Sequence, residues 1–524
     1  MANKNLFQSM VGAMAPPANT INEAGGSAYA FDPKHALAQY AATGCMNATF
    51  YANAETQLAT VLQICGQVEP EFVAKTALFA RTEGHMKDLP ALLMAVLSAK
   101  DGAMAERVFD RVIDNGKMLR NYVQIVRSGV TGRKSLGTRP KRMVRAWFDR
   151  RSDDQVFVGS IGSTPSMADV IRMVHPRPTS DSRRALLGHL IGRPVVADQL
   201  PEKVREYEAF KRAPSKLAVP DVPFEMLTSL KLGTREWKEI AKRASWQMTR
   251  MNLNTFLRHG VFEDRGVTKL IADRLRNEGL IKKARVFPYQ LMMAWKSASI
   301  NLPHSVRDAL QDAMEIAIDN VPEISGNVFV FPDVSGSMHS PVTGLRKGAT
   351  TEVRCIDVAA LVAAAMLRKN RRATIMPFSN SVVEASLNSR DSVMTNAEKL
   401  ASLPSGGTNC SAPMAMLNKK KLDADLIVYV SDNESWMDSN TSRTWAISAV
   451  TATMAEWKKL KSRCPKAKLV CIDIQPYGST QAAESEDVFN VGGFSDQVFR
   501  FIADVSAGRA QKGYWVNTIE KMSI

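Results

Sequence analysis

Apolar residues recur at intervals of three and four from Asp32 to about Asn320. This spacing puts them on one face of a helix, so the pattern predicts one amphipathic helix after another. Short stretches rich in Pro, Gly, Asp and Ser separate these segments, which favours antiparallel helix pairs joined by short turns. No strict repeat is present, so a solenoid of helical pairs is a structural interpretation. The spacing is clearest at Leu58, Val61, Leu62 and Cys65, and at Leu89, Leu92, Leu93, Val96 and Leu97.

The pattern changes at Gly326, where short β-rich apolar runs begin to alternate with helices. Such alternation predicts a mostly parallel sheet with helices on both faces. We therefore expect a flexible N-terminal arm at 1–30, an all-α domain at 31–325 and an α/β domain at 326–524. Predicted strands cover 327–331, 373–378, 382–387, 425–430 and 467–474, and predicted helices cover 355–369, 442–461 and 495–505.

The composition narrows the class of protein. Apolar residues make up 45% and charged residues 23%, which is ordinary for a globular chain. No window reaches the roughly 18 apolar residues of a membrane span, and the polar Gln8 and Ser9 break up the only signal-like segment. The six cysteines are scattered and include no CxxC pair. This usage predicts reduced thiols in the cytoplasm and argues against a zinc site.

The excess positive charge lies in the first part of the chain. The whole chain carries a net +16, while residues 326–524 hold 23 basic and 19 acidic residues, so residues 1–325 carry the remaining +12. A basic domain suggests an anionic partner, and nucleic acid is the commonest one. A charged surface that only keeps the protein in solution is the alternative.

Oxygen-bearing side chains follow three segments of the predicted α/β domain. Asp333, Ser335 and Ser337 come directly after a predicted strand, Thr408 follows a glycine pair, and Asp432 follows the strand at 425–430. Ligands of open α/β sheets bind beyond the carboxyl ends of the strands. Carboxylate and hydroxyl oxygens suit a hard cation such as Mg²⁺ or Mn²⁺. The alternative is that the two aspartates cap helices or turns.

This set resembles the von Willebrand factor A domain and its metal-ion-dependent adhesion site, whose pattern is DxSxS, then a Thr, then an Asp. The resemblance implies a divalent metal ion held by Asp333, Ser335, Ser337, Thr408 and Asp432, with an open position for a partner's carboxylate. Asn409 stands where relatives often have Asp. Neither a positioned base nor a nucleophile is evident, so we expect no enzyme activity.

A second group of side chains is basic. Residues 131–151, TGRKSLGTRPKRMVRAWFDRR, hold eight basic residues and one acidic residue. Pro140 suits the first turn of a helix, and Thr138 is a possible cap. At 100° per residue the apolar side chains share one face, and Arg142 and Arg145 lie opposite, with Lys141 at the boundary. The surface could follow a phosphate backbone, and a merely solvated face is the alternative. The apolar set is Met143, Val144, Trp147 and Phe148.

The segment RSGVTGRKSLGTRPKRMVRAWF resembles a signature of the Ro autoantigen family, the TROVE-type RNA-binding proteins. DVIRMVHPRP and VFPYQLMMAWKSA also match, as do DVSGSM and GGTNCSAPM, in the family's order and closer to its bacterial members. The resemblance implies a ring of HEAT-like helical repeats closed by the A domain. It further implies a non-catalytic protein in RNA quality control. Such a protein binds single-stranded 3′ ends of misfolded RNA in a central hole and a small Y-like RNA on its basic outer surface. The RNA in turn can tether an exoribonuclease or RNA-repair enzyme.

The resemblance carries over unevenly to single residues. His175 matches a family histidine implicated in Y RNA contact, and Arg172 lies one turn before it. The stretch before this motif, QVFVGSIGSTPS, lacks the basic residues that relatives carry, which puts the strength of Y-like RNA binding in doubt. Arg81, His85 and Lys87 are secondary candidates. The basic signature assigns RNA contact to Arg127, Arg133, Lys134, Arg139, Lys141, Arg142 and Arg145.

Two other functions compete with RNA binding. A protein scaffold would grip an acidic partner through the metal, and its positive charge would then be incidental. A metal-dependent nuclease fits poorly, because one or two carboxylates with hydroxyls are a poor set for the two-metal mechanism. A ring closed within one chain predicts a monomer without membrane association.

Overall fold

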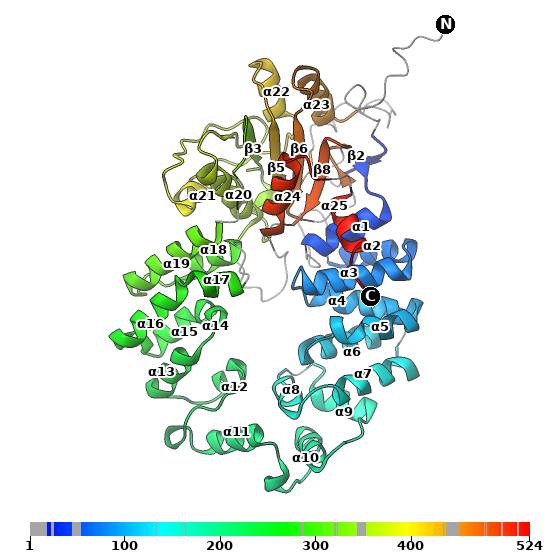
Figure 1. Cartoon of the computed structure of the whole chain (residues 1–524), viewed down its shortest axis with the longest axis vertical. Coiled ribbons are helices and arrows are strands. Elements are labelled where there is room, and N and C mark those ends of the chain that lie inside the picture. The colour runs from blue at the N-terminus through cyan, green and yellow to red at the C-terminus, as the bar shows by residue number, and fades with distance from the viewer. Residues whose placement is uncertain are drawn as a thin grey trace. The chain divides into compact units, whose positions relative to one another are not determined.

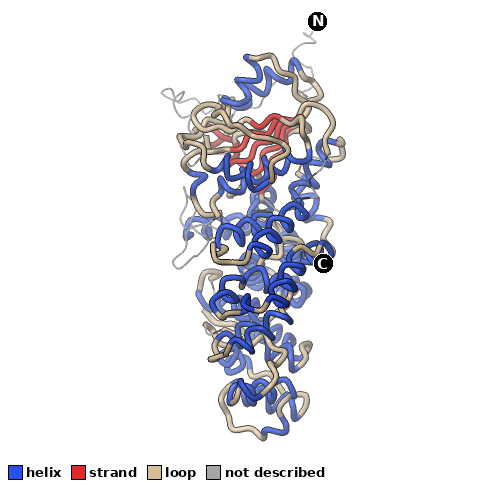
Figure 2. Tube along the Cα trace, turned by 90° about the vertical axis from the view of Figure 1, so that its left-hand side faces the viewer, coloured by secondary structure: helices blue, strands red, loops and turns tan. Residues whose placement is uncertain are grey.

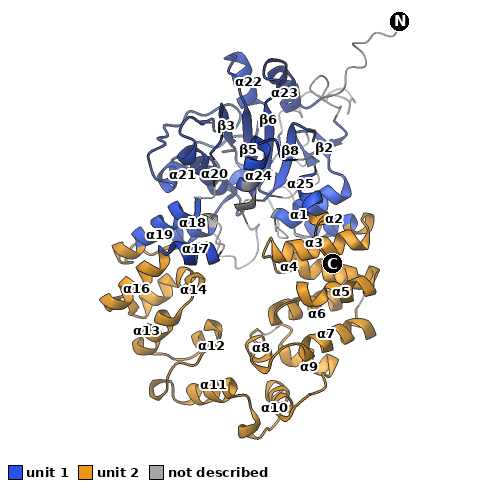
Figure 3. Ribbon diagram, in the orientation of Figure 1, with its two compact units in different colours: residues 1–64, 276–297, 307–518 blue, residues 65–275, 298–306, 519–524 orange. Residues whose placement is uncertain are grey.

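A computed structural model gives the fold of the chain. Its residues form two compact units that do not follow chain order (Figure 3). The first unit comprises residues 1–64, 276–297 and 307–518, and the second comprises residues 65–275, 298–306 and 519–524. The structure describes residues 18–22, 26–43, 54–132, 134–162, 164–284, 288–318, 321, 323–342, 353–432, 434–435, 450–475, 477, 479–493, 496–510 and 513–524.

The second unit is helical, as the apolar spacing predicts. Its helices begin at polar caps: the Asn115 side chain accepts the Met118 N–H, and Ser152 and Ser166 each form a capping box. Each helix packs against the next helix or the one after it: α3 contacts α4 and α5, α4 contacts α6, and α5 contacts α7. The helices are α3 (Pro70–Thr82), α4 (Asp88–Lys100), α5 (Gly102–Val112), α6 (Gly116–Ser128), α7 (Thr138–Asp149), α8 (Asp153–Val158), α9 (Met167–Val174), α10 (Asp181–Leu190), α11 (Glu202–Arg212), α12 (Phe224–Thr228), α13 (Thr234–Arg243), α14 (Trp246–Met251), α15 (Leu253–Arg258) and α16 (Arg265–Leu275).

The first unit is built on a five-stranded parallel sheet with the strand order β4-β3-β5-β6-β8 (Figure 1). Figure 2 shows these strands gathered side by side among helices. The central strands β3 and β5 are wholly buried, which explains their continuous apolar runs. The strands are β3 (Val328–Pro332), β4 (Thr374–Ile375), β5 (Leu426–Ser431), β6 (Lys468–Asp473) and β8 (Val488–Gly492). The helices are α1 (Pro33–Thr43), α2 (Ala54–Gln67), α17 (Glu278–Ala284), α18 (Pro288–Ser297), α19 (His304–Ala317), α20 (Cys355–Lys369), α21 (Val393–Ala401), α22 (Ala412–Lys419), α23 (Ala452–Arg463), α24 (Asp496–Ser506) and α25 (Tyr514–Glu520).

Aromatic residues join the sheet to the loop that follows α21. The Tyr429 ring on β5 packs edge-on against Phe331 and Phe378, with centroid distances of 4.9 and 5.7 Å. Its buried hydroxyl donates a hydrogen bond of 2.7 Å to the carbonyl of Cys410. One side chain of the sheet therefore fixes the backbone two residues beyond Thr408.

The structure corrects part of the strand prediction. The predicted strand at 382–387 is wrong: Val382 makes a single bridge to Phe378, and no strand follows. The neighbouring strand is only Thr374–Ile375, although the Met376 and Phe378 N–H groups still donate to β3. The chain then reverses, with the Val383 N–H bonded to the Pro377 carbonyl. The strand β8 was missed.

The N-terminal region also differs from the expected flexible arm. β1 (Thr20–Ile21) pairs with β2 (Ser27–Ala30), which pairs with β7 (Ser479–Thr480) in a small antiparallel sheet. Helix α1 packs against β8, and there the His35 ring contacts the Glu484 carboxylate at 3.0 Å. Two other predictions reach outside the described residues, namely residues 1–17 of the arm and residues 442–449 of the helix whose described part is α23.

The structure bears on two compositional expectations. In the described part of the chain, no helix is both long enough and apolar enough to span a membrane. The five described cysteines, Cys65, Cys355, Cys410, Cys464 and Cys471, are buried, and none of them forms a disulfide.

Candidate metal centre and nucleic-acid interface

The first predicted metal loop leaves the carboxyl end of β3 in the first unit. Asp333, Ser335 and Ser337 are all buried. The Ser335 N–H donates to one carboxylate oxygen of Asp333 at 2.8 Å, and the hydroxyls of Ser335 and Ser337 lie 3.2 Å apart. The alternate spacing thus turns one carboxylate and two hydroxyls toward a common point.

The other two predicted loops meet the first one. The Gly336 N–H donates to the carbonyl of Gly406 at 2.8 Å, which ties the β3 loop to the loop of buried Thr408. The Ser431 hydroxyl at the end of β5 donates to Asp333 at 2.6 Å, and Ser337 hydrogen-bonds Asp432. The structure therefore brings the five sequence-predicted residues together.

Buried negative charge accumulates at these strand ends. Burial and the nearby Asp432 carboxylate raise the pKa of Asp333 to about 7, and burial likewise raises the pKa of Asp432. Asp473, which ends β6 opposite Ser431, is a third buried carboxyl that the sequence analysis missed. Burial and Asp432 raise its pKa well above the usual value. Its position at the end of a predicted strand was the signal that could have found it.

These residues fit a hard divalent cation. The Asp432 carboxylate is buried, and one of its oxygens has no hydrogen-bond partner among the described residues. A cation would satisfy that oxygen and offset the repulsion between neighbouring carboxylates. In the described part of the chain no cluster of three or more His, Cys, Asp or Glu side chains could hold a metal, so any site here depends on hydroxyl ligands as well.

Asn409 has a local role in its own loop. Its side-chain oxygen accepts hydrogen bonds from the N–H and hydroxyl of Ser411, and its amide donates to the Asn380 carbonyl at 3.1 Å. The amide group therefore shapes the loop that presents Thr408.

Most basic candidates lie in the second unit on α6, α7 and α9, with Lys134 in the loop between α6 and α7, and α9 packs against both of the other helices. Met143, Val144, Trp147 and Phe148 are buried, as their helical spacing predicts. Arg142 and Arg145 are exposed, and Lys141 is half-buried at the boundary. Helix α7 begins at Thr138 itself with Gly137 before it, so Thr138 is not the cap that we expected.

Several of these cations already have protein partners. Arg142 makes a two-pronged ion pair with Glu106 of α5, with N–O distances of 3.0 and 2.6 Å. Arg145 donates to the carbonyl of Val174 at the end of α9. Arg172 donates to the Ile191 carbonyl at 2.8 Å and lies 3.7 Å from the Asp169 carboxylate. Arg145 and Arg172 therefore satisfy carbonyls at helix ends, and Arg142 joins α7 to α5.

Other predicted cations are more available. Arg127, Lys134 and Arg139 are exposed, and with Lys141 they make no ion pair within the described residues. Arg139 lies over the start of α5, where a Cβ added to Gly102 would come within 2.6 Å of it. Arg133 lies outside the described residues.

Two hollows connect part of this set. Arg127 and Arg172 line a groove of about 770 Å³ together with Asp169. Arg172 and His175 line a neighbouring pocket of about 440 Å³. His175 is exposed and ends α9 in the left-handed conformation, with φ 51°, and its N–H bonds the Ile171 carbonyl at 2.9 Å. The structure thus groups Arg127, Arg172 and His175.

The segment without cations, residues 155–166, forms most of α8 and the loop after it. Its Thr164 and Pro165 line the groove that contains Arg127 and Arg172. Arg120 approaches this loop from α6: it is 8% exposed, and a Cβ on Gly162 would meet its guanidinium at 1.9 Å. Burial lowers the pKa of Arg120. This internal arginine is a cation near the groove that sequence reasoning missed.

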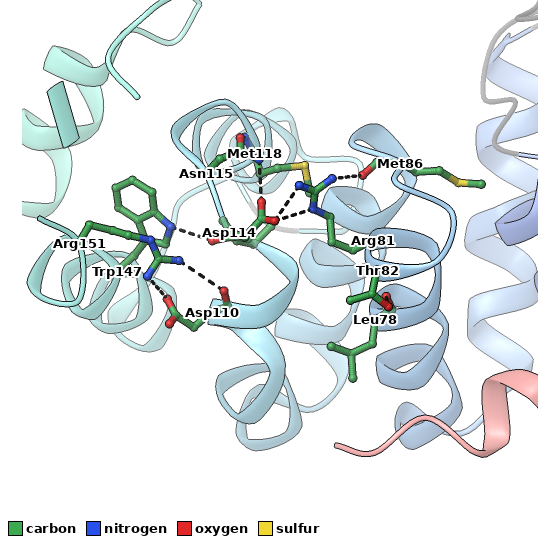
Figure 4. Close-up of polar contacts among 11 residues, drawn as sticks. Leu78, Arg81, Thr82, Met86, Asp110, Asp114, Asn115, Met118, Trp147 and Arg151 are labelled. Carbon is green, nitrogen blue, oxygen red and sulfur yellow. Dashed lines mark hydrogen bonds and ion pairs between the residues drawn. The ribbon is translucent and has the colours of Figure 1, made fainter. Parts of the chain in front are cut away.

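The secondary candidates lie at the α3–α4 junction. The Arg81 guanidinium donates two hydrogen bonds to the Asp114 carboxylate, at 2.7 and 2.9 Å, and one to the Met86 carbonyl. Figure 4 shows these contacts. The same view shows Arg151 beside Asp110. His85 and Lys87 are exposed. Partial burial and the neighbouring cations lower the pKa of Lys87.

Known proteins are similar to this chain in sequence and in fold. The TROVE domain model matches residues 166–315, and the Ro60 vWA domain model matches residues 328–506. The RNA-binding protein RO60 of Deinococcus radiodurans is 23% identical over 509 residues, covering 90% of this chain and 92% of that protein. The crystal structure of the Deinococcus radiodurans RO (RSR) protein has a TM-score of 0.63 at 19% identity and covers 91% of this chain and all of that one. A helical region with a TROVE domain, followed by an A domain with a parallel sheet, places this chain in the Ro family.

Proposed function

We propose that this protein binds RNA through the basic layer of α6, α7 and α9. The observation that carries the proposal is the set Arg127, Lys134, Arg139 and Lys141, which has no acidic partner among the described residues. Such cations position a phosphate backbone without reading its sequence. The relative in Deinococcus radiodurans is named an RNA-binding protein, which supports the same ligand class here.

The finer assignment rests on the family resemblance. A small Y-like RNA binds the basic outer surface, and single-stranded 3′ ends of misfolded RNA enter a central hole. The protein then acts in cytoplasmic RNA quality control without catalysis, as a monomer that an RNA-tethered exoribonuclease or repair enzyme joins. RNA that copurifies from native cells, identified by sequencing, tests this assignment: one dominant small structured RNA supports it, and bare protein contradicts it.

The RNA surface is tested by changing Lys134, Arg139 and Lys141 together to alanine. At 0.15 M salt each lost phosphate contact costs a factor of about five, from a slope of about −0.8 per contact, so the triple variant loses about 100-fold in affinity. The slope of log K against log salt should fall by between about 2 and 3. The measurement is a salt series with a stem–loop RNA that carries a single-stranded 3′ tail.

A matched variant removes the same charge elsewhere. Lys419, Lys420 and Lys466 are exposed in the first unit, and no ion pair involves them among the described residues. Changing these three to alanine should leave both the affinity and the slope nearly unchanged. Equal losses in the two triple variants would show that net charge, and not this surface, sets the affinity.

A second candidate function belongs to the A-type domain. We propose that Asp333, Ser335, Ser337, Thr408 and Asp432 hold Mg²⁺ or Mn²⁺, and that an acidic group of a protein partner completes the coordination. The buried Asp432 oxygen that lacks a partner within the described residues favours this proposal. Mg²⁺ at 100 times its Kd would stabilise the unit by about 2.7 kcal/mol. Wild type should melt higher in Mg²⁺ than in EDTA, and Asp333→Ala should melt at one temperature in both.

A further inference from the structure

A pocket in the second unit is lined by residues of the end of α9, of α10 and of the segment 191–199. Figure 1 labels the two helices. The pocket has a volume of about 440 Å³. Its walls are mainly apolar: Ile171, Ala185 and Leu187 are buried there, and Val196 remains 59% exposed at its edge. An apolar hollow of this size accommodates a small planar ring.

Positive charge surrounds this hollow. Arg172, His175, Arg184 and Arg193 line it and are exposed, and within the described residues no acidic side chain lines it. The carboxylates of Asp169 and Asp181 pair with Arg172 and Arg184 but are not among the lining residues. The pocket therefore offers an apolar floor and a cationic rim.

Backbone contacts fix its shape. Arg172 donates to the Ile191 carbonyl at 2.8 Å, and the Arg193 N–H donates to the Gly188 carbonyl at 2.9 Å. Val195 lies so near α10 that a Cβ on Gly188 would come within 2.9 Å of it. The close approach of the 191–196 segment to α10 depends on that glycine, and these bonds define the pocket without any ligand.

We infer that this pocket holds one unstacked nucleotide of the bound RNA, with its base on the apolar floor and its phosphates at the rim. The inference rests on the proposed function and adds a direct contact between the protein and a base of the RNA. Proteins bind unpaired RNA bases by stacking them on rings and guanidinium planes. Here the His175 ring, three proline rings and the arginine side chains line the pocket, and the neighbouring Arg127 groove shares Arg172 with it.

The test compares two oligomers of equal charge, a uridine 12-mer and an abasic ribose-phosphate 12-mer. Wild type should bind the uridine oligomer at least about fivefold more tightly, the effect expected of one stacked base. Ala185→Leu fills the floor and should abolish that ratio while the abasic oligomer binds as before. Val196→Glu, an exposed position with little risk to folding, should weaken the uridine oligomer most. Met251→Glu, 67% exposed in the same unit, is the charge-matched control and should keep the ratio.

The outcomes separate the two proposals. If wild type binds neither oligomer, the proposed RNA binding is wrong. If it binds both but shows no preference for uridine, or if both pocket variants keep the preference, RNA binding stands and the pocket assignment is overturned. Uridine monophosphate is titrated in parallel. Micromolar binding of that mononucleotide, without a base effect in the oligomer, would identify a free nucleotide as the occupant and overturn the assignment to RNA.

Discussion

Replacing Arg183 by methionine should make local unfolding of α7 and α10 easier. Arg183 lies on α10 and is 8% exposed. Its guanidinium donates to the carbonyls of Phe148 and Arg151 at 2.7 and 2.6 Å, and it pairs with Asp153. One side chain therefore satisfies the carboxyl end of α7 and a carboxylate at the start of α8. Methionine keeps the length of the stem and removes all three interactions.

The magnitude follows from these contacts. Hydrogen bonds from a charged donor contribute roughly 1.5–3 kcal/mol each, and two are lost to buried carbonyls. Asp153, 23% exposed, then keeps only the Ser182 hydroxyl, at 2.6 Å, as a hydrogen-bond partner within the described residues. Removing one partner of a largely buried ion pair costs about 3–5 kcal/mol, since the other charge loses its compensation. Because these losses belong to one side chain and do not add in full, we expect local opening to become easier by at least about 4 kcal/mol, or roughly a thousandfold.

Hydrogen exchange measured on peptides from α7 and α10 tests this value. Arg184→Met is the matched control, because its pair with Asp181 is 68% and 70% exposed and should contribute less than about 1 kcal/mol. A tenfold or smaller change for Arg183→Met, or equal changes in the two variants, would refute the argument that these carbonyls depend on the arginine. A variant that also carries Asp153→Asn is compared by the same assay. If it regains protection from hydrogen exchange, the unpaired Asp153 carboxylate accounts for part of the lost free energy.

Three further outcomes are expected. Trp147→Phe removes a buried 2.7 Å bond to a backbone carbonyl and should lower the unfolding free energy by about 1–2 kcal/mol in urea titration. Burial alone would raise the pKa of Asp487, but hydrogen bonds from two lysines lower it. This carboxylate therefore stabilises the fold above its unfolded pKa of about 4 and ceases to do so at lower pH. Asp487→Asn should then flatten the acid side of the stability curve. Tyr429→Phe removes the hydrogen bond to the Cys410 carbonyl near Thr408. Its melting temperature should fall further below that of the wild type in Mg²⁺ than in EDTA.

The fold followed from the sequence wherever periodicity and burial agree. The amphipathic spacing of Met143, Val144, Trp147 and Phe148 found the buried face of α7, and the apolar run at Cys355–Lys369 matches α20 residue for residue. The predicted strand at 382–387 is wrong because its apolar residues belong to a loop that turns back after Phe378, with the Val383 N–H bonded to the Pro377 carbonyl. The pairing of β2 with β7 joins segments about 450 residues apart, and local patterns hold no information on such a partner.

The two candidate sites differed in how far the sequence could describe them. The loops of the five predicted metal ligands meet in the structure, because strand ends of a parallel sheet gather at one edge, and metal binding itself stays a prediction. Asp473 escaped notice because it belongs to no motif and only the register with Ser431 brings it near. The partners of Arg142 and Arg172 were also hidden, since Glu106 and the Ile191 carbonyl are 36 and 19 residues away.

Those hidden partners change what the charge count means. A net +12 in residues 1–325 suggests a surface made for polyanions, yet many of these cations serve the fold. Lys100 donates to the carbonyls of Cys65 in the last turn of α2 and of Val68 just after it, and Arg274 donates to Ala241 near the end of α13. Stacked short helices leave many carbonyl ends, and a long cation from the next helix satisfies them. We therefore expect the phosphate contacts to come from cations without such partners, which is why the triple variant avoids Arg142, Arg145 and Arg172. Its loss of affinity will then report RNA contact and not unfolding.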